Sequence, residues 1–331
     1  MDMPDDIPER ALAWHREGRG AALATVIETW GSAPRRPGAM LAVSGEGEMM
    51  GSVSGGCVEG AVVVAAIDAV ANGAPEVLEF GVADEEAFAV GLACGGTIRV
   101  LVEPVAAMGE ERLSAIVRAR SERRSIGYKV NLASWEREIV GPEDDPARFS
   151  ADRSGTDGDV LTVIHAAPLR LVVVGAVHIA QPLVEMARLA GFDPVVIDPR
   201  EAFASAARFP ATDLRTGWPD EEMAAVAPDG RTAVVTLTHD PKLDDPALHV
   251  ALRSDAFYIG ALGSIRTHAK RLARLEEAGL GHSSDRIRAP VGLDIGAVTP
   301  AEIAVSVLAE IVAALRRRRA GSPAKPEAAA A

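Results

Sequence analysis

The segment Ser52–Gly60 places a cysteine directly after two glycines, where a helix is expected to begin. Gly55 and Gly56 let backbone N–H groups approach a ligand closely, and the start of a helix carries partial positive charge. Cys57 at such a position is favoured as a thiolate, the form that binds soft metals and attacks sulfur. A free cysteine is equally common as a small core residue beside a tight turn. The residue types alone leave both interpretations open.

The second cysteine, Cys94, precedes Gly95 and Gly96 and then an expected strand, so it repeats the pattern in reverse order. The two cysteines could share one pocket as a dithiol site, or one of them could be structural. The chain has no CxxC pair, and the separation of Cys57 from Cys94 fits no zinc pattern, so we expect no zinc site. Two cysteines in 331 residues also do not make a disulfide framework.

Two adjacent arginines, Arg35 and Arg36, lie in the Pro/Gly-rich segment 31–38 that follows an expected strand. Guanidinium groups on a stiff loop could hold a phosphate or a pterin through paired hydrogen bonds. A solvated turn with surface charge is the simpler interpretation. Both arginines remain candidates for cofactor binding.

A further candidate site follows the apolar run Leu169–Val174. Gly175 and the residues up to Ala180 nearly match the pattern G-x-G-x-x-G/A of dinucleotide-binding folds, and Asp198 has the place of an acidic ribose ligand. Val177 occupies the second glycine position, where its side chain should obstruct a pyrophosphate. The pattern therefore indicates the fold strongly and a bound NAD weakly. His178, at the expected start of the helix, could point at a ligand or act as a cap.

Three more polar residues are expected at the carboxyl edge of the same sheet. His239 and Asp240 follow the expected buried strand Thr232–Leu237, and Asp294 lies in a glycine-flanked segment that approaches this edge. Open α/β sheets bind ligands at this edge. These side chains could converge with His178 on a ligand, although turns and caps explain several of them as well.

The elements that must position these residues fall into three zones and a tail. We expect an α/β domain with the Gly-Gly-Cys loop over 1–105, a connecting region over 106–167, a doubly wound parallel sheet over 168–319 and a disordered tail over 320–331. The first zone combines strands such as Ala21–Ile27 with a helix over Val58–Val70. In the connecting region, the polar stretch Glu143–Asp159 is typical of an exposed loop or interdomain linker. The last helix is expected over Pro300–Leu315.

Composition limits the classes of partner. The net charge of −13 and a pI near 5.1 argue against nucleic acid, because a duplex-binding surface needs clustered Lys and Arg. No window approaches ~20 uninterrupted apolar residues, which argues against a membrane span. The acidic start MDMPDDIPER is unlike a secretory signal. We therefore expect a soluble, cytoplasmic protein.

At this point several motifs together resemble a known family. The runs ATVIETWGSAPRRPGAMLAV and GSVSGGCVEG resemble the N-terminal domain of the xanthine dehydrogenase accessory (XdhC/CoxI) family. The runs LVVVGAVHIAQPLVEMARLAGFDPVVIDPR, TLTHD, YIGALGS and PVGLDIGAVTPAEIAVSVLAEI resemble its Rossmann-type C-terminal domain. The likeness covers both ends of the chain in the expected order and omits the middle zone and the tail.

The resemblance implies a chaperone-like accessory protein rather than an enzyme. Family members bind molybdenum cofactor (molybdopterin), support its terminal sulfuration and deliver it to an apo molybdenum hydroxylase of the xanthine dehydrogenase type. The family's GGC position is Cys57 here and its second cysteine position is Cys94; its GxGH loop is matched at Gly175 and His178, with Val177 in place of the second glycine. That departure argues against the usual dinucleotide pose in this Rossmann domain.

On this interpretation Cys57 would ligate molybdenum or relay sulfur, and Arg35 and Arg36 would hold the phosphate end of the cofactor. The edge of the Rossmann sheet would form the opposite wall or bind a nucleotide extension of the cofactor. A cysteine desulfurase is an expected sulfur-supplying partner. A homodimer is expected because most soluble oligomers are symmetric homo-oligomers.

Three other functions are compatible with parts of the sequence. An NAD(P)-dependent oxidoreductase would explain the fold and Asp198, but not Val177 or the Gly-Gly-Cys loop. A structural scaffold would bind the target enzyme and no small ligand. A cysteine hydrolase has the least support, because no histidine lies near Cys57 in the sequence.

Overall fold

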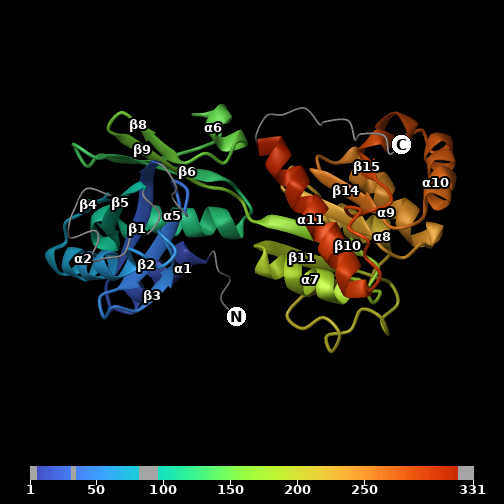
Figure 1. Ribbon diagram of the computed structural model, residues 1–331, viewed down its shortest axis with the longest axis horizontal. Helices are drawn as coiled ribbons and strands as arrows, with labels where there is room; N and C mark the ends of the chain where they lie inside the picture. The colour runs from blue at the N-terminus through green and yellow to red at the C-terminus, as the bar shows by residue number, and fades with distance from the viewer. Residues whose placement is uncertain (1–5, 31–34, 82–95, 320–331) are drawn as a thin grey trace. The chain divides into compact units, whose positions relative to one another are not determined.

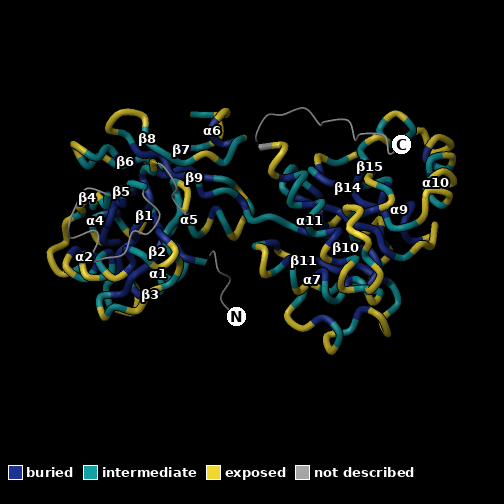
Figure 2. Tube along the Cα trace, viewed as in Figure 1, coloured by how far each residue is buried: buried dark blue, intermediate teal, exposed yellow. Residues whose placement is uncertain are grey.

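The computed structural model of the protein describes residues 6–30, 35–81 and 96–319. The chain divides between Ala167 and Pro168 into two compact units (Figure 1). Each unit has hydrophobic clusters of its own. Figure 2 shows that the buried residues of each unit follow its strands, whereas exposed residues lie on loops and on the outer turns of helices.

The first unit is built on an antiparallel sheet with strand order β3-β2-β1-β5-β4. Its strands are β1 (Ala21–Trp30), β2 (Met40–Ser44), β3 (Met49–Gly51), β4 (Glu76–Phe80) and β5 (Thr97–Pro104). β1 is central, because it pairs with β2 on one side and with β5 on the other. This confirms a buried strand at Ala21–Ile27, whose residues are apolar or, at Thr25, β-branched.

Alternate residues of β1 face opposite sides of this sheet. Ala22, Ala24 and Val26 belong to the cluster that includes helix α2, and Leu23 and Ile27 belong to the cluster that includes helices α1, α4 and α5. The helices are α1 (Ile7–Arg16), α2 (Glu59–Asn72), α4 (Val105–Met108) and α5 (Glu110–Ser121). Helix α2 ends where Gly73 takes a left-handed conformation.

The region expected to connect the domains instead forms a second antiparallel sheet, in the order β7-β6-β9-β8. Its elements are β6 (Ile126–Asn131), β7 (Arg137–Val140), α6 (Pro146–Ser150), β8 (Gly155–Asp157) and β9 (Val160–His165). The interpretation of Glu143–Asp159 as one exposed loop or linker was therefore wrong. Phe149 and Arg148 of α6 are buried, and Tyr128 and Leu161 share a cluster with α1 and α5. Residues on both sides of position 105 thus contribute to one core.

The second unit holds a parallel sheet in the order β12-β11-β10-β13-β14-β15. Its strands are β10 (Leu169–Val174), β11 (Phe192–Ile197), β12 (Asp213–Arg215), β13 (Thr232–Thr236), β14 (Tyr258–Ala261) and β15 (Ile287–Arg288). This is the 3-2-1-4-5-6 order of a doubly wound dinucleotide-binding sheet, with its switch point between β10 and β13. The predicted α/β class is confirmed.

Helices cover both faces of this sheet. Leu171 and Val173 of β10 pack on the side of α7 and α11, and Val172 and Val174 pack on the side of α8, α9 and α10. The helices are α7 (Ala180–Leu189), α8 (Pro219–Val226), α9 (Pro241–Arg253), α10 (Ile265–Glu277), a short 3-10 turn η1 (Gly281–Arg286) and α11 (Pro300–Arg319). Both faces of β10 are covered, which explains why all of its residues except Arg170 are apolar. Within the described ranges, none of these helices combines the length and the apolar character that crossing a membrane requires.

Candidate functional site

The Gly-Gly-Cys loop of the first unit is organised around a carboxylate of its own helix. Glu59, the first residue of α2, is buried and points back into the loop. It accepts hydrogen bonds from four backbone N–H groups, those of Val53, Ser54, Gly55 and Gly56, and from the hydroxyls of Ser52 and Ser54. The N···O distances to Ser54, Gly55 and Gly56 are 2.9, 3.0 and 2.9 Å. The N–H groups expected to receive a ligand are therefore occupied by Glu59.

Burial alone would raise the pKa of Glu59, but the hydrogen bonds from Ser54 and Ser52 outweigh burial and lower it to about 2. The carboxylate is therefore ionised at neutral pH. An anionic ligand placed at the same N–H groups would meet this charge. Gly55 and Gly56 thus shape the loop, and their N–H groups, which the sequence predicted would approach a ligand, donate to Glu59 in this structure.

Cys57 lies in this loop two residues before α2 and is partly exposed. Its N–H donates to the Ser54 hydroxyl at 3.0 Å, and its side chain packs at the margin of the cluster beneath α2. Gly56 has a φ of +118°, and a Cβ atom placed there or at Gly60 would meet nothing within 4 Å. The backbone that carries the thiol is fixed by hydrogen bonds, and the space beside the neighbouring glycines is open.

The other residues of the first unit that were predicted to bind a cofactor are Arg35, Arg36 and Cys94. Arg35 and Arg36 are exposed between β1 and β2, and in the described part of the chain neither has an ion-pair partner. Cys94 lies outside the described residues. Among those that are described, no group of three or more His, Cys, Asp or Glu side chains is arranged to hold a metal ion.

In the second unit, the loop after β10 is closed by Asp198. This residue follows β11, is fully buried, and accepts hydrogen bonds from the Ala176 N–H at 2.8 Å and from the Arg200 side chain at 2.7 and 2.8 Å. Burial alone would raise the pKa of Asp198, but the hydrogen bonds from Arg200 and Ala176 lower it. Asp198 therefore has no exposed oxygen for a ribose hydroxyl, and the predicted role as a ribose ligand differs from its observed one.

Position 175 excludes a larger residue because of its backbone conformation and its packing. Its φ is +106°, and a Cβ there would lie 2.5 Å from the Thr238 side chain. Helix α7 begins at Ala180 rather than at His178, so His178 is an exposed turn residue. Val177 is partly buried against the core of this unit. The structure thus brings Gly175 next to the segment after β13.

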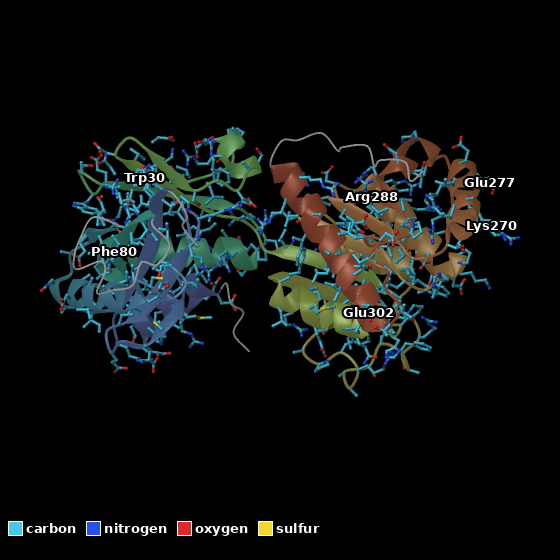
Figure 3. All side chains as sticks on the ribbon, viewed as in Figure 1. Trp30, Phe80, Lys270, Glu277, Arg288 and Glu302 are labelled. Carbon is cyan, nitrogen blue, oxygen red and sulfur yellow. The ribbon has the colours of Figure 1, made fainter. Side chains whose placement is uncertain are left out.

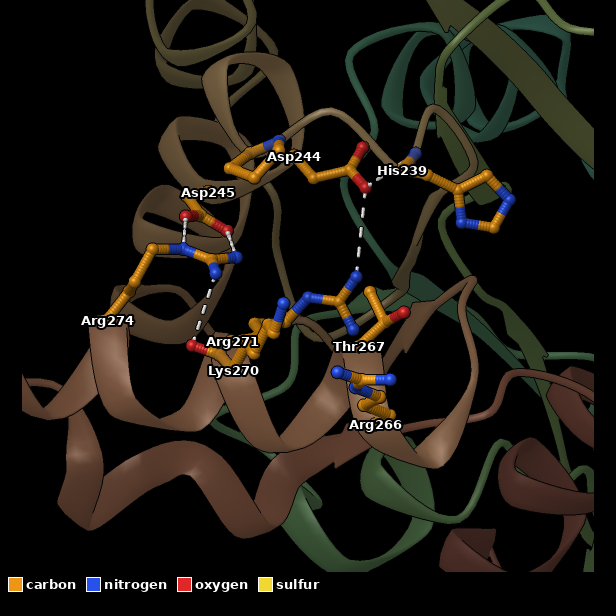
Figure 4. Close-up of a pocket in the computed structure, with 9 residues that line it drawn as sticks. His239, Asp244, Asp245, Arg266, Thr267, Lys270, Arg271 and Arg274 are labelled. Carbon is orange, nitrogen blue, oxygen red and sulfur yellow. Dashed lines mark hydrogen bonds and ion pairs between the residues drawn. The ribbon is translucent and has the colours of Figure 1, made fainter.

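Beyond β13 and β14 a pocket of about 250 Å³ opens between helices α9 and α10 (Figure 4). It is lined by His239, Pro241, Asp244, Asp245, Arg266, Thr267, Lys270, Arg271 and Arg274. Of the predicted residues only His239 lines it. Asp240 caps α9 by accepting from the Lys242 N–H at 2.9 Å, and Asp294 is exposed on the loop before α11.

Asp244 organises the pocket wall that carries His239. It is 1% exposed and accepts from the Thr238 hydroxyl at 2.6 Å and from the His239 N–H at 3.1 Å. Burial raises the pKa of Asp244 despite these bonds. His239 has a φ of +63°, a left-handed conformation that these hydrogen bonds hold in place.

Sequence reasoning missed Glu59, Asp244 and the basic residues of α10. Glu59 belongs to the run GSVSGGCVEG. A glutamate at this position does not by itself indicate that its side chain will turn back toward the N–H groups of the loop. Arg266, Lys270 and Arg274 recur every four residues, and this spacing would have indicated one basic face of a helix.

Comparisons with known proteins match both units. The model of the XdhC and CoxI family matches residues 14–81, and that of the XdhC Rossmann domain matches residues 171–311. The chain is 30% identical over 295 residues to the molybdenum cofactor insertion chaperone PaoD of Escherichia coli (strain K12), covering 89% of this chain and 83% of that protein. It is 28% identical to a protein of Bacillus subtilis (strain 168) described as a probable xanthine dehydrogenase component, covering 90% and 94%.

A solved structure agrees with these relatives. The crystal structure of a protein described as a xanthine dehydrogenase from Bacillus halodurans is 26% identical in sequence and superposes with a TM-score of 0.79. The match covers 96% of this chain and 98% of that one. The similarity therefore extends over both units, including the middle zone that the sequence motifs left uncovered.

Proposed function

Since this chain belongs to the XdhC and CoxI family, we propose that it is a molybdenum cofactor insertion chaperone for a molybdenum hydroxylase of the xanthine dehydrogenase type. The observation that carries the proposal is the relationship to PaoD, which spans most of both chains. The relative from Bacillus subtilis and the structure from Bacillus halodurans both bear the name of xanthine dehydrogenase, which supports this class of client enzyme.

We place the cargo's metal end at Cys57. The thiol is partly exposed, and its backbone is held by the network around Glu59 and Ser54. A thiolate on a rigid loop suits a soft metal, since little ordering remains to be done on binding. In the same proposal Arg35 and Arg36 hold the phosphate end, because their exposed guanidinium groups have no ion-pair partner among the described residues.

Sulfuration of the cargo belongs to the same proposal as its finer part. A cysteine desulfurase would supply the sulfur, and Cys57 is the described thiol that would receive or orient it. The apo hydroxylase then takes the loaded cofactor, and the chain returns unchanged. An accessory role of this kind asks for binding and release rather than turnover of a metabolite.

The NAD(P)-dependent oxidoreductase has weaker support. Its dinucleotide would need the N–H groups after Gly175 and a free acidic ribose ligand. The Ala176 N–H is donated to Asp198, and that carboxylate is buried and shared with Arg200. Titration of the protein with NADH, followed by fluorescence, tests this alternative directly, and saturable binding would revive it.

The experiment that tests the proposal compares wild type with Cys57→Ala after co-expression with the cofactor pathway. Molybdenum and pterin are measured per chain, and activation of an apo hydroxylase is followed with the eluted protein. We expect wild type to carry both and Cys57→Ala to lose most of the molybdenum. Val64→Ala, an exposed position on α2, is the control.

The two parts of the proposal fail separately. A wild-type protein that carries no pterin and activates no apo hydroxylase would refute the chaperone function. A Cys57→Ala protein with wild-type molybdenum content would refute only the role of the thiolate. Cys57→Ser keeps the backbone hydrogen bond to Ser54 and separates loss of sulfur from loss of loop structure.

A further inference from the structure

Helix α10 presents a row of positive charges to the pocket between α9 and α10. Arg266, Lys270 and Arg274 are spaced four residues apart, so they lie on one face of the helix. Like charges at this spacing destabilise a helix. Arg274 is neutralised by Asp245 through two hydrogen bonds, one of them 3.0 Å long. Arg266 and Lys270 are exposed, and in the described part of the chain neither has a carboxylate partner.

Arg271 adds a fourth positive charge, and this one is buried. The residue is 1% exposed, and its Nη2 donates to the Leu262 carbonyl at 3.0 Å and lies 3.8 Å from Asp244. Its Nε and Nη1 have no hydrogen-bond partner among the described residues. Because buried polar groups are nearly always hydrogen-bonded, these two donors point to a ligand. Figure 4 shows the guanidinium of Arg271 between Asp244 and Thr267, within the pocket.

The charges around the pocket favour an anion. Four cationic side chains and two carboxylates line it, and one of those carboxylates, Asp245, is already paired with Arg274. The pocket also lies by the first turns of α9 and α10, where helix dipoles favour negative charge. His239 and Thr267 supply further polar contacts at the wall.

We propose that this pocket binds a phosphate group, with Arg271 as the buried donor and Arg266 and Lys270 at the rim. The unpartnered Nε and Nη1 of Arg271 can each donate a charge-assisted hydrogen bond to a phosphate oxygen. The volume of about 250 Å³ is below the range of pockets that enclose a drug-sized ligand, so it suits a phosphate rather than a whole dinucleotide. The site is separate from the loop after β10, where dinucleotide pyrophosphates bind in folds of this class.

Two sources of phosphate share this chemistry: free inorganic phosphate and the phosphate of an organic monoester. The test is therefore isothermal titration of the full chain with inorganic phosphate and, separately, with ribose 5-phosphate. We expect saturable binding of at least one probe. Tighter binding of ribose 5-phosphate would assign the site to an organic phosphate, and tighter binding of inorganic phosphate would assign it to the free ion.

Variants at exposed positions separate a loss of phosphate binding from a loss of folding. Arg266→Ala/Lys270→Ala removes two exposed charges and is expected to weaken binding by about tenfold or more. Arg316→Ala/Arg317→Ala removes two exposed charges from α11 and should leave binding unchanged. Arg271→Lys keeps a buried cation but loses the Nε and Nη1 donors, and we expect it to weaken binding with circular dichroism unchanged.

The proposal is overturned if neither probe binds at millimolar concentration, or if Arg266→Ala/Lys270→Ala and its α11 counterpart bind equally well. Neither measurement involves molybdenum or pterin, so the phosphate site can fail while the chaperone function holds, and the reverse.

Discussion

The Glu59 carboxylate accepts hydrogen bonds from the N–H groups of the Gly-Gly-Cys loop that the sequence predicted would approach a ligand. The residue types of the loop were sufficient to predict a strand, a turn and a helix around Cys57, because glycine and the apolar periodicity act locally. They were insufficient to predict the direction of the Glu59 side chain, because its partners become neighbours only when the loop closes. The glycines and the acid therefore work together to fix the backbone beneath the thiol.

We predict that Glu59→Gln destabilises the first unit by at least about 2 kcal/mol, because an amide has one acceptor oxygen and its NH₂ group would face N–H donors. Urea unfolding at pH 7 measures the change. Asp68→Asn, an exposed carboxylate on the same helix, should shift the free energy of unfolding by less than about 0.5 kcal/mol. Equal effects of the two variants would contradict the role of the Glu59 network.

The single residue His165 is expected to make the stability of the first unit depend on pH. It is buried in β9, and burial, with a smaller contribution from Arg120, lowers its pKa from 6.5 to about 3. Between these two values the unfolded chain binds a proton that the folded chain does not. His165 therefore costs stability progressively as pH falls below 6.5, at up to about 1.4 kcal/mol per pH unit.

His165→Phe should remove this slope, which unfolding experiments between pH 7.5 and 5 would detect as a flatter dependence in the variant. His249 on α9 is only partly exposed and also has a lowered pKa because of burial, so its variant is a poor control. The exposed His282→Phe is the better one, since it should keep the wild-type slope. An unchanged slope in His165→Phe would mean that other groups carry the acid sensitivity.

Elements with a strong local pattern were predictable, and elements that depend on partners were not. The strand at Leu169–Val174 matched its predicted bounds, because five apolar residues out of six, between a proline and a glycine, strongly favour a buried strand. The helix predicted from His178 begins at Ala180, since the turn after Gly175 is held by Asp198 from a neighbouring strand. The polar run Glu143–Asp159 contains α6 and β8, which are ordered by contacts with distant residues.

The pocket of the second unit could not be predicted from the sequence for the same reason. Its residues come from α9 and α10, which are separated in the chain by β14. The sequence predicted that His239 would lie near the sheet edge, but not that α10 would face it. Figure 3 shows Lys270 projecting outward from α10, as expected for a rim residue that would be taken for ordinary surface charge.

Two sheets of the first unit are joined by a buried ionic contact. Glu103 of β5 is 3% exposed and accepts from the Tyr128 hydroxyl of β6 at 2.7 Å and from Arg137 of β7 at 2.6 Å. We predict that Arg137→Met destabilises this unit by about 3 kcal/mol, because it leaves a buried carboxylate without its cation. Thermal unfolding checks this, with the exposed Arg118→Met as control.

A loss below about 1 kcal/mol in Arg137→Met would contradict this account of the contact. Glu103→Gln/Arg137→Met removes both charges and should recover part of the loss. That recovery would separate the cost of an unpaired charge from the cost of lost packing.

For the whole molecule, the boundary between Ala167 and Pro168 determines which fragments of the chain can fold alone. Among the described residues, each hydrophobic cluster takes its buried members from one side of the junction between Ala167 and Pro168. The region expected to connect the domains lies wholly within the first unit. Each unit therefore has a hydrophobic core of its own, which is the usual condition for a domain that folds alone.

We predict that residues 1–167 and residues 168–331, expressed separately, each fold and unfold cooperatively. The fragment 168–331 contains all residues of the phosphate pocket, so its affinity for the phosphate probe should lie within about threefold of the full chain. A fragment cut at 105 instead should aggregate or unfold without cooperativity, because it separates Leu23 and Ile27 from Tyr128 and Leu161 of the same cluster. If the fragment 1–105 folds as well as 1–167, the second sheet is not part of the first core and the boundary belongs where the sequence first suggested it.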